Sequence, residues 1–219
     1  MTSAADSRRG GFITLEGIEG VGKSANLQFV AGLLRTAGLT VVVTREPGGV
    51  PAAERIRELL LAPGEPSLPP VAELLLMFAA RAVHLRDLVE PALAAGSWVV
   101  CDRFTDATYA YQGAGRGLPE ALIAQLENAV QGNLRPHLTL LLDADWEATR
   151  GRRIGRGAGD RFEQEDVAFF TRVRAGYLAR ARAEPQRVCI IDAALDLDRV
   201  RESLGRAVTQ FLERHRGQG

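Results

Sequence analysis

The segment Gly17-Ile-Glu-Gly-Val-Gly-Lys-Ser24 is the most informative stretch of this chain about its fold. It fits the pattern G-x-x-x-x-G-K-[ST] and lies between an apolar run at 11–16 and a helical pattern at 24–36. Glycines here let backbone N–H groups turn toward phosphate oxygens, and the N-terminus of the following helix adds partial positive charge. The segment therefore predicts a phosphate-binding loop. Its nucleotide contacts are expected from Gly17, Ile18, Glu19, Gly20, Val21, Gly22, Lys23 and Ser24.

Two side chains of this loop supply charge and metal-binding chemistry. Lys23 can bridge the β- and γ-phosphates of ATP, and the Ser24 hydroxyl can ligate Mg²⁺. Lys23 is also the only lysine in the chain, and it stands where this chemistry requires an ammonium. Asp102, at the end of a predicted strand, is the carboxylate expected near Mg²⁺. The alternative for Asp102 is a helix N-cap or an ion pair with Arg103, and Asp143 at a similar strand end is interpreted as mainly structural.

The remaining chain alternates short apolar runs with helical patterns. Strands are expected at 11–16, 40–44, 98–101, 138–142 and 187–191. Helices are expected at 24–36, 51–61, 71–95 (interrupted near Pro91), 119–131, 147–153, 165–183 and 198–214. Such alternation requires parallel pairing with crossovers, which predicts an α/β P-loop NTPase fold: a five-stranded parallel sheet with helices on both faces. Ligands then bind beyond the carboxyl ends of the strands.

Composition restricts the setting in which this fold works. The formal net charge is zero, so no field of the whole chain draws it to nucleic acid or to an anionic membrane. No apolar run reaches the ~18 residues of a membrane span. The two cysteines have no metal-ligand spacing, which favours a reducing, cytoplasmic compartment. Residues 1–10 are expected to form a disordered tail, and residues 11–219 one domain.

A phosphate-binding loop alone leaves kinases, GTPases, transport ATPases and partitioning ATPases open. The guanine-reading motif N/T-K-x-D needs a second lysine, and so does the lysine-rich loop of partitioning ATPases. Both are therefore excluded. Another nucleoside monophosphate or deoxynucleoside kinase stays open, as does an ATPase that acts as a switch or partner-binding module.

Further segments resemble the bacterial thymidylate kinases over residues 11–213. The resemblance is carried by Leu15–Ser24, Thr44-Arg-Glu-Pro-Gly-Gly49, Leu76-Met-Phe-Ala-Ala-Arg81, Cys101-Asp-Arg103, Tyr111-Gln112 and Asp160-Arg-Phe-Glu163. It implies transfer of the γ-phosphoryl group of Mg-ATP to dTMP. It also implies a homodimer formed through the long helix from Val71.

The resemblance also implies roles for single residues. Phe78 would stack on thymine, although a core position in the long helix is the alternative. Arg81 and Thr108 would bind the base edge, Arg81 having a solvated helix face as its alternative. Tyr111 would exclude a ribose hydroxyl, with Gln112 beside it. The remaining acceptor contacts would come from Glu19 near the 3′-hydroxyl, Pro47 in a turn that can hold a cis peptide, and the phosphate-binding Arg45 and Arg103.

The expected catalytic residues are Lys23, Arg103, Glu19 and a group of lid arginines. The loop Gly17–Ser24 holds no arginine, so the chain resembles the subset of the family that supplies this charge from a lid, here 152–163. Arg152, Arg156 and Arg161 are favoured over Arg153, and a solvated basic loop is the alternative for any one of them. A phosphate acceptor has a second pKa of about 6 and needs no general base. His84, His137 and His215 are therefore interpreted as surface or packing residues.

Overall fold

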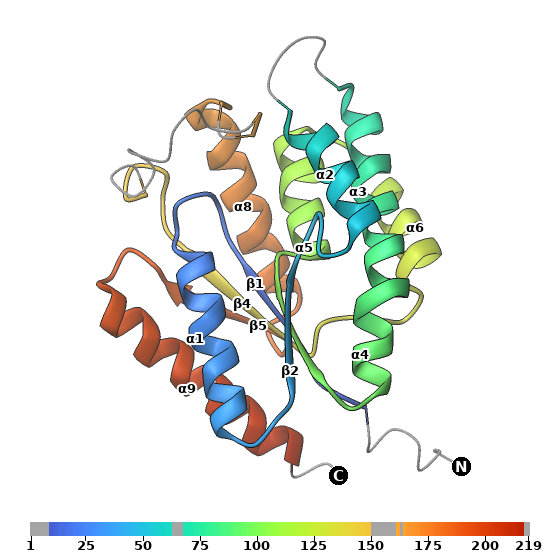
Figure 1. Ribbon diagram of the computed structural model, residues 1–219. Helices are drawn as coiled ribbons and strands as arrows, with labels where there is room; N and C mark the ends of the chain where they lie inside the picture. The colour runs from blue at the N-terminus through green and yellow to red at the C-terminus, as the bar shows by residue number, and fades with distance from the viewer. Residues whose placement is uncertain (1–8, 63–67, 150–160, 163, 217–219) are drawn as a thin grey trace.

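The computed structural model describes residues 9–62, 68–149, 161–162 and 164–216, and its centre is a five-stranded sheet (Figure 1). The strands are β1 (Phe12–Glu16), β2 (Val41–Arg45), β3 (Trp98–Asp102), β4 (Leu138–Asp143) and β5 (Val188–Asp192). All neighbours pair in parallel, in the order β2-β3-β1-β4-β5. The predicted five-stranded parallel sheet is therefore confirmed.

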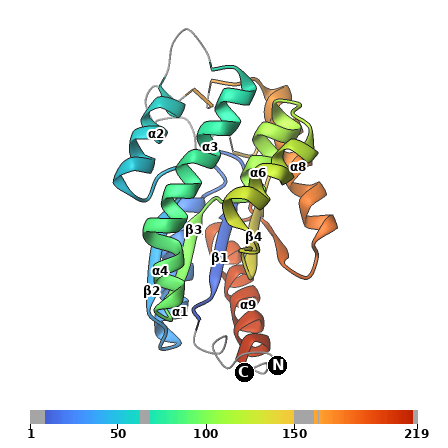
Figure 2. The same ribbon diagram turned by 90° about the vertical axis from the view of Figure 1, so that its right-hand side faces the viewer.

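Helices cover both faces of the sheet (Figures 1 and 2). On one face lie α1 (Lys23–Thr36) and α9 (Leu197–Arg216), which contact each other. The other face carries α4 (Glu90–Ala94), α5 (Thr105–Thr108) and α8 (Val167–Ala183). Beyond the carboxyl ends of the strands, α2 (Pro51–Leu61) packs against α3 (Pro70–His84), and α3 also contacts α6 (Glu120–Gln131).

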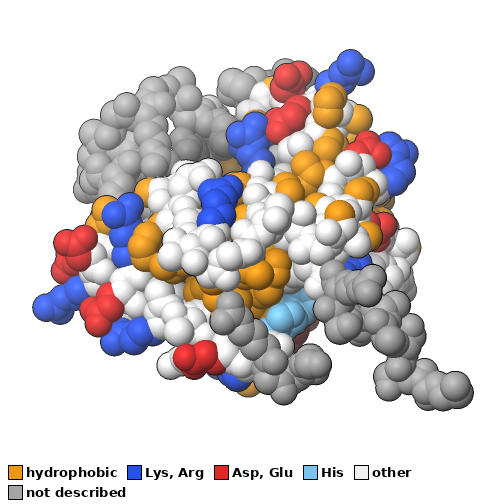
Figure 3. Space-filling model, turned by 60° about the horizontal axis from the view of Figure 1, so that its bottom comes forward, with side chains coloured by type: hydrophobic (Ala, Val, Ile, Leu, Met, Phe, Trp, Pro, Cys, Tyr) orange, Lys and Arg blue, Asp and Glu red, His pale blue; other side chains and the backbone are white. Residues whose placement is uncertain are grey.

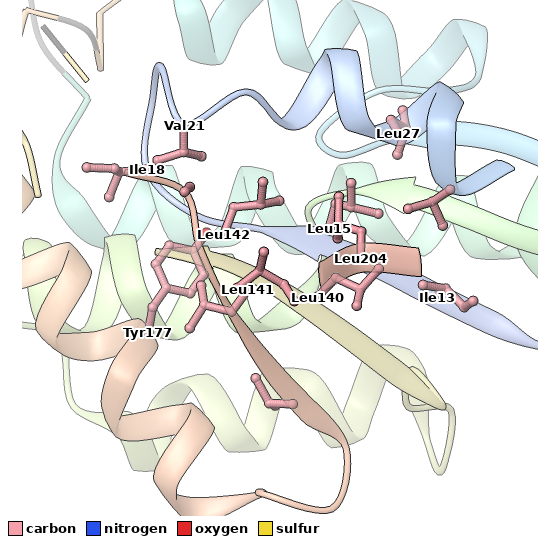
Figure 4. Close-up of a cluster of buried hydrophobic side chains, with 14 of the residues drawn as sticks. Ile13, Leu15, Ile18, Val21, Leu27, Leu140, Leu141, Leu142, Tyr177 and Leu204 are labelled. Atoms are coloured by element: carbon pink, nitrogen blue, oxygen red, sulfur yellow. The ribbon is translucent and has the colours of Figure 1, made fainter. Parts of the chain in front are cut away.

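The core is built around the neighbouring strands β1 and β4 in the middle of the sheet (Figure 4). Ile13 and Leu15 of β1 and Leu140 of β4 are completely buried, because helices cover both faces of a parallel sheet. Two apolar residues of the phosphate-binding loop, Ile18 and Val21, join this cluster with exposures of 2% and 1%. The loop is thus fastened to the core by its apolar side chains, and its backbone is left for binding.

The expected long helix at 71–95 is three segments. Helix α3 ends at His84, a π-helical turn η2 (Leu85–Val89) follows, and α4 begins at Glu90. Pro91 explains the break, because it has no N–H to donate to the carbonyl of Asp87 and its ring would clash there. The wider π-turn before Pro91 removes this conflict.

Three other expectations differ from the structure or fall outside it. Gly10, expected in the tail, is buried and donates its N–H to the Leu93 carbonyl at 2.9 Å, whereas residues 1–8 lie outside the described residues. Residues 146–149 form turns where a helix was expected, and the rest of that helix lies outside the described residues. Of the expected lid, only Arg161 and Phe162 are described.

One segment to which no element had been assigned is helical. Helix α5 continues directly into a π-helical segment, η3 (Tyr109–Gly115), which packs along α8. This placement matters for function because the segment begins right after Asp102 and Arg103 at the end of β3.

On the face opposite the carboxyl ends of the strands, neither positive nor negative side chains form a patch of a single sign (Figure 3). Basic and acidic side chains are scattered over this face, and hydrophobic side chains show between them near its centre. Within the described ranges, no helix combines the length and the apolar character that crossing a bilayer requires.

Candidate functional site

The phosphate-binding loop follows β1, and its last two residues, Lys23 and Ser24, begin α1. Gly17, Gly20 and Gly22 have φ angles of 136°, 80° and 94°, a region that side chains with a Cβ rarely adopt. Lys23 is 7% exposed, and its Nζ donates to the carbonyls of Gly17 (2.9 Å) and Ile18 (2.8 Å). Burial, followed by the nearby Arg103 charge, lowers the Lys23 pKa to about 8. The ammonium therefore already lies inside the loop, at the place where phosphate oxygens would enter.

Two oxygens beside the loop fit a divalent cation. The Ser24 side chain is exposed in the first turn of α1. Asp102 ends β3, and within the described part of the chain its buried Oδ1 has no hydrogen-bond partner. A buried carboxylate oxygen without a partner is costly, and Mg²⁺ prefers such oxygens as ligands. The two predicted ligands thus have the donor chemistry that Mg²⁺ requires.

Arg103 joins the loop to the neighbouring cavity. Its φ is 69°, a strained conformation for a residue with a side chain. Its Nη2 donates to Glu19 Oε1 (2.6 Å) and to the Tyr111 hydroxyl (3.1 Å), and this hydroxyl donates to Glu19 Oε2 (2.6 Å). Burial raises the Glu19 pKa, but Arg103, Lys23 and the Tyr111 hydrogen bond outweigh it and lower the pKa overall. Glu19 is therefore a carboxylate held between two cationic groups.

A cavity opens beside this triad, between the loop, α2, α3 and η3. Seven of the nine residues that we expected at the acceptor line it: Glu19, Pro47, Arg81, Arg103, Thr108, Tyr111 and Gln112. The lining also includes residues that we had not assigned to the acceptor: Glu46, Arg57, Leu61, Met77, Phe104, Ala107 and Phe162. The sequence motifs thus converge on one hollow next to the phosphate-binding loop.

Phe78 does not line this cavity. It is 2% exposed and packs in a core cluster with Leu74, Tyr109 and Ile123, as the alternative interpretation of this residue allowed. The guanidinium of Arg81 lies 4.8 Å from the centre of the Phe78 ring. The preceding residue, Met77, lines the cavity instead. In this arrangement the Phe78 ring packs against the Arg81 guanidinium.

Arg81 is held by a buried network rather than on a solvated helix face. Its Nε donates to Glu46 Oε2 (2.7 Å) and its Nη2 to the Thr108 hydroxyl (3.0 Å). Its buried Nη1 has no hydrogen-bond partner within the described residues, although the residue lines the cavity. Burial raises the Glu46 pKa, but the Arg81 charge and the His84 hydrogen bond lower it overall. Arg81 therefore has one free donor group for a ligand.

His84 extends this network, which the sequence alone did not reveal. It is completely buried, with Nδ1 2.9 Å from Glu46 Oε1 and Nε2 2.7 Å from the Thr44 hydroxyl. Our assignment of His84 to the surface or to simple packing therefore missed a hydrogen-bonding role. The signal was its spacing, since His84 stands three residues after Arg81 on the same face of α3. The Glu46–Pro47 peptide at the edge of the network is cis, the isomer considered for this turn.

Arg45 lies apart from the cavity lining. Its side chain is 53% exposed and pairs with Glu54 at 2.9 Å. Arg57 lines the cavity, and its Nη1 donates to the Pro47 carbonyl at 2.8 Å. Arg57 was not among the expected site residues, because nothing in its local sequence distinguishes it from the other polar residues of α2.

The arginines of the expected lid are only partly visible. Arg152 and Arg156 lie outside the described residues. Arg161 is described, and its Nη2 contacts Glu73 Oε2 at 2.6 Å. Glu73 also accepts a hydrogen bond from Gln112 of the cavity lining, at 2.8 Å. Asp143, interpreted as structural, binds Arg174 through both carboxylate oxygens, at 2.7 and 2.8 Å.

Comparison with known proteins gives one consistent result. The family model described as thymidylate kinase matches residues 15–204. The chain is 57% identical over 206 residues to a thymidylate kinase of Pseudomonas fluorescens, covering 94% of this chain and 98% of that protein. It is 57% identical over 203 residues to a thymidylate kinase of Teredinibacter turnerae, covering 93% and 99%.

A solved structure agrees with these sequence matches. The crystal structure of a thymidylate kinase from Ehrlichia chaffeensis superposes with a TM-score of 0.74 at 32% identity, covering 93% of this chain and 99% of the other. The predicted P-loop NTPase fold is thereby confirmed, and so is the resemblance read from the motifs. The chain belongs to the thymidylate kinase family.

Proposed function

We propose that this chain transfers the γ-phosphoryl group of Mg-ATP to dTMP, giving ADP and dTDP. Family membership supports the reaction class. One observation carries the proposal: the contact between Arg103 and Glu19 connects the phosphate-binding loop to the cavity proposed for the acceptor. Lys23 lies in the donor loop, and Arg103 contacts that loop while it lines the acceptor cavity.

The chemistry requires charge neutralisation rather than a base. The acceptor phosphate has a second pKa of about 6, so its attacking oxygen is mostly ionised at neutral pH. The difficulty is to bring two polyanions together and to stabilise the charge on the transferring group. Lys23 would hold the donor phosphates and Arg103 the acceptor phosphate. Arg45, which is exposed in this structure, is proposed as a second ligand of that phosphate. Further cationic charge is proposed from Arg152 and Arg156.

The cavity can recognise the base and the sugar. The free Nη1 of Arg81 and the Thr108 hydroxyl are proposed to bind the edge of thymine. Tyr111 would lie beside C2′ of the sugar and leave no room for a ribose hydroxyl. Glu19, held by Tyr111 and Arg103, would accept a hydrogen bond from the 3′-hydroxyl of the sugar. Gln112 would contact the nucleotide from the same segment.

Ser24 and Asp102 are the proposed Mg²⁺ ligands, because both present oxygens beside the loop and Asp102 Oδ1 has no partner in the described structure. When bound, Mg²⁺ neutralises charge on the β- and γ-phosphates.

We also propose a homodimer formed through α2 and α3, where Leu59, Val71 and Leu75 are 54%, 47% and 52% exposed. The free thiols of Cys101 and Cys189 fit the reducing cytoplasm, which we propose as the compartment.

A coupled ADP-release assay over an acceptor panel tests the proposed reaction. The panel is dTMP, dUMP, dCMP, dGMP, AMP and thymidine, each with Mg-ATP. We expect dTMP to have the highest kcat/KM and thymidine to be inert, because Arg103 would have no phosphate to bind. A different best acceptor would assign the chain to another nucleotide kinase. ATP hydrolysis without a phosphorylated acceptor would indicate an ATPase switch.

A further inference from the structure

Glu73 is a buried carboxylate that receives several donors at once. It lies in the first turn of α3 and has no exposed surface. Its Oε1 accepts from Gln112 Nε2 (2.8 Å) and from Arg116 Nε (3.3 Å). Its Oε2 lies 2.6 Å from Arg161 Nη2 and 3.3 Å from Arg116 Nη2. One negative charge thus connects α3, the end of η3 and the residues after 160.

Arg161 has further contacts that fix its position. Its Nε donates to the Leu60 carbonyl (3.0 Å), and its backbone N–H donates to the Leu61 carbonyl (3.3 Å). The side chain is 12% exposed, and its guanidinium lies 4.7 Å from the centre of the Phe162 ring. An arginine with this many partners loses them all if it leaves to meet a phosphate, and it would leave Glu73 with less compensation.

These contacts reach the acceptor cavity at three points. Leu61, Gln112 and Phe162 all line that cavity. Gln112 is held directly by Glu73, and Phe162 and Leu61 are neighbours of Arg161 or bonded to it. Phe162 also makes an edge contact with Tyr111, with ring centres 5.8 Å apart. The Glu73–Arg161 pair therefore fixes several walls of the cavity without lining it.

We propose that Glu73 and Arg161 are positioning residues for the acceptor, and that Arg161 is an anchor rather than a group that contacts the transferring phosphoryl. The pair holds the Gln112 amide and the Phe162 ring in the geometry that the acceptor requires. This inference rests on the proposed function only in that dTMP is the acceptor used to test it. It assigns to Arg161 a different role from the one that its place in the expected lid suggested.

The test separates dTMP binding from the rate of phosphoryl transfer. We measure the Kd of dTMP by calorimetry, together with kcat and the KM of both substrates, for Glu73→Gln, Arg161→Gln, Arg161→Lys and the double variant Glu73→Gln/Arg161→Gln. Each Gln variant should raise the Kd and KM for dTMP by about tenfold, the loss expected for a charge-assisted hydrogen bond, while the KM for ATP changes less than about twofold. Arg161→Lys should recover part of the affinity because it keeps the charge.

The double variant shows whether the two residues act together. If they position the acceptor through each other, its dTMP affinity should be close to that of the weaker single variant. If the losses of dTMP affinity in the two single variants multiplied in the double variant, that result would overturn the proposal. So would a fall of about 10³-fold in kcat for Arg161→Gln at an unchanged Kd, which is the result expected of a transition-state arginine.

Glu165→Gln is the matched control. Its carboxylate pairs with Arg116 at 2.6 Å, so the substitution disturbs the same arginine, while no contact between Glu165 and Glu73 is present within the described residues. The dTMP affinity should stay within about twofold of the unaltered protein. Lower melting temperatures in the Gln variants with unchanged dTMP affinity would show a purely structural role. If the unaltered protein neither binds nor phosphorylates dTMP, the proposed function fails instead.

Discussion

The Tyr111 hydroxyl lies 2.6 Å from Glu19 Oε2, and Arg103 Nη2 donates to both residues. Burial, only partly opposed by the Arg103 charge, raises the Tyr111 pKa well above its usual value, so the phenol stays protonated and donates to the carboxylate. The ring and the hydroxyl of Tyr111 therefore have separable roles. The ring fills space at the cavity, and the hydroxyl orients Glu19.

Replacing Tyr111 should divide these two roles. Tyr111→Ala removes the ring and should lower the preference for dTMP over its ribose analogue by about tenfold or more, an effect comparable to the loss of a steric contact in a pocket. Tyr111→Phe keeps the ring and should retain the preference, while it lowers kcat/KM for both substrates because Glu19 loses a hydrogen bond. The measurement is the ratio of kcat/KM for the two sugars. An unchanged ratio in Tyr111→Ala would exclude this residue as the sugar gate.

The arginines of the expected lid are the next target. Gly17–Ser24 contains Lys23 but no arginine, so we proposed that further cationic charge at the transferring phosphoryl comes from the expected lid. We expect Arg152→Ala or Arg156→Ala to lower kcat by about 10³-fold or more, as for other arginines that stabilise this transition state. Arg153→Ala is the matched control and should keep kcat within about threefold. Full activity in both Arg152→Ala and Arg156→Ala would mean that neither supplies this charge.

The buried pair of Glu46 and Arg81 should dominate the stability of the acceptor side. Both residues are at most 4% exposed, and the removal of one buried partner typically costs about 3–5 kcal/mol. We expect Glu46→Leu to lower the free energy of unfolding by that order, measured by urea denaturation. Adding Arg81→Met should restore part of the loss, because no uncompensated cation remains, yet the double variant should stay inactive with dTMP. Equal losses in the single and double variants would show that the arginine charge is not the cause.

Glu16 should make stability depend on pH. Burial raises its pKa from 4.5 to about 8, with a further contribution from Asp106, while hydrogen bonds from Tyr177 and the Phe104 N–H oppose the shift. The folded state thus favours the protonated carboxyl. The contribution of protonated Glu16 to the free energy of unfolding is complete below about pH 4.5. It falls as the pH rises and is lost above about pH 8.

The isosteric variant Glu16→Gln tests this dependence. It cannot ionise, so its stability relative to the unaltered protein should improve between about pH 5 and pH 8, by a few kcal/mol in total, and then level off. Chemical denaturation at several pH values measures the difference, in which the titration of other groups largely cancels. A difference that stays constant with pH would show that Glu16 is ionised in the folded protein.

The elements around the phosphate-binding loop were predictable because local patterns determine them. The apolar run of β1, the glycines of the loop and the helical spacing of α1 each specify their structure without help from distant residues. By contrast, η3 was missed because its sequence is rich in glycine and small residues. Tertiary packing holds it: a Cβ on Gly176 of α8 would lie 2.7 Å from Ala114 Cβ, and one on Gly115 would lie 2.7 Å from Phe169 Cε2.

The residues of the candidate site also differ in whether local sequence or tertiary packing determines their position. Residues inside motifs, such as Lys23 and Arg103, lie at the loop and the cavity where the motifs predicted them, because a motif specifies both backbone and side chain; their roles stay predictions. Met77 and Phe78 could not be told apart, since both stand one turn before Arg81 on α3, and the packing of α3 against α6 and η3 sets which one meets the cavity. Glu73 was missed because nothing local marks a carboxylate whose partners are 39 to 88 residues away.

Chemical modification tests the central role of Lys23 directly. The chain has one lysine, so an acylating reagent meets two amines, the α-amino group and Lys23 Nζ. The lowered pKa of about 8 leaves roughly half of the Lys23 amines unprotonated and nucleophilic at that pH. We expect mild acylation at pH 8 to inactivate the enzyme, with the loss of activity following Lys23 modification in peptide mass spectra.

Protection by ligands then identifies what Lys23 binds. Mg-ATP should slow the inactivation far more than dTMP, because its phosphates would occupy the loop and engage the ammonium that now contacts the carbonyls of Gly17 and Ile18. Acylation of the α-amino group should proceed at the same rate with either ligand, which provides the internal control in the same spectra. If activity survives nearly complete modification of Lys23, or if dTMP protects better than Mg-ATP, then Lys23 does not hold the donor phosphates. Better protection by dTMP than by Mg-ATP would reverse the assignment of donor and acceptor sides.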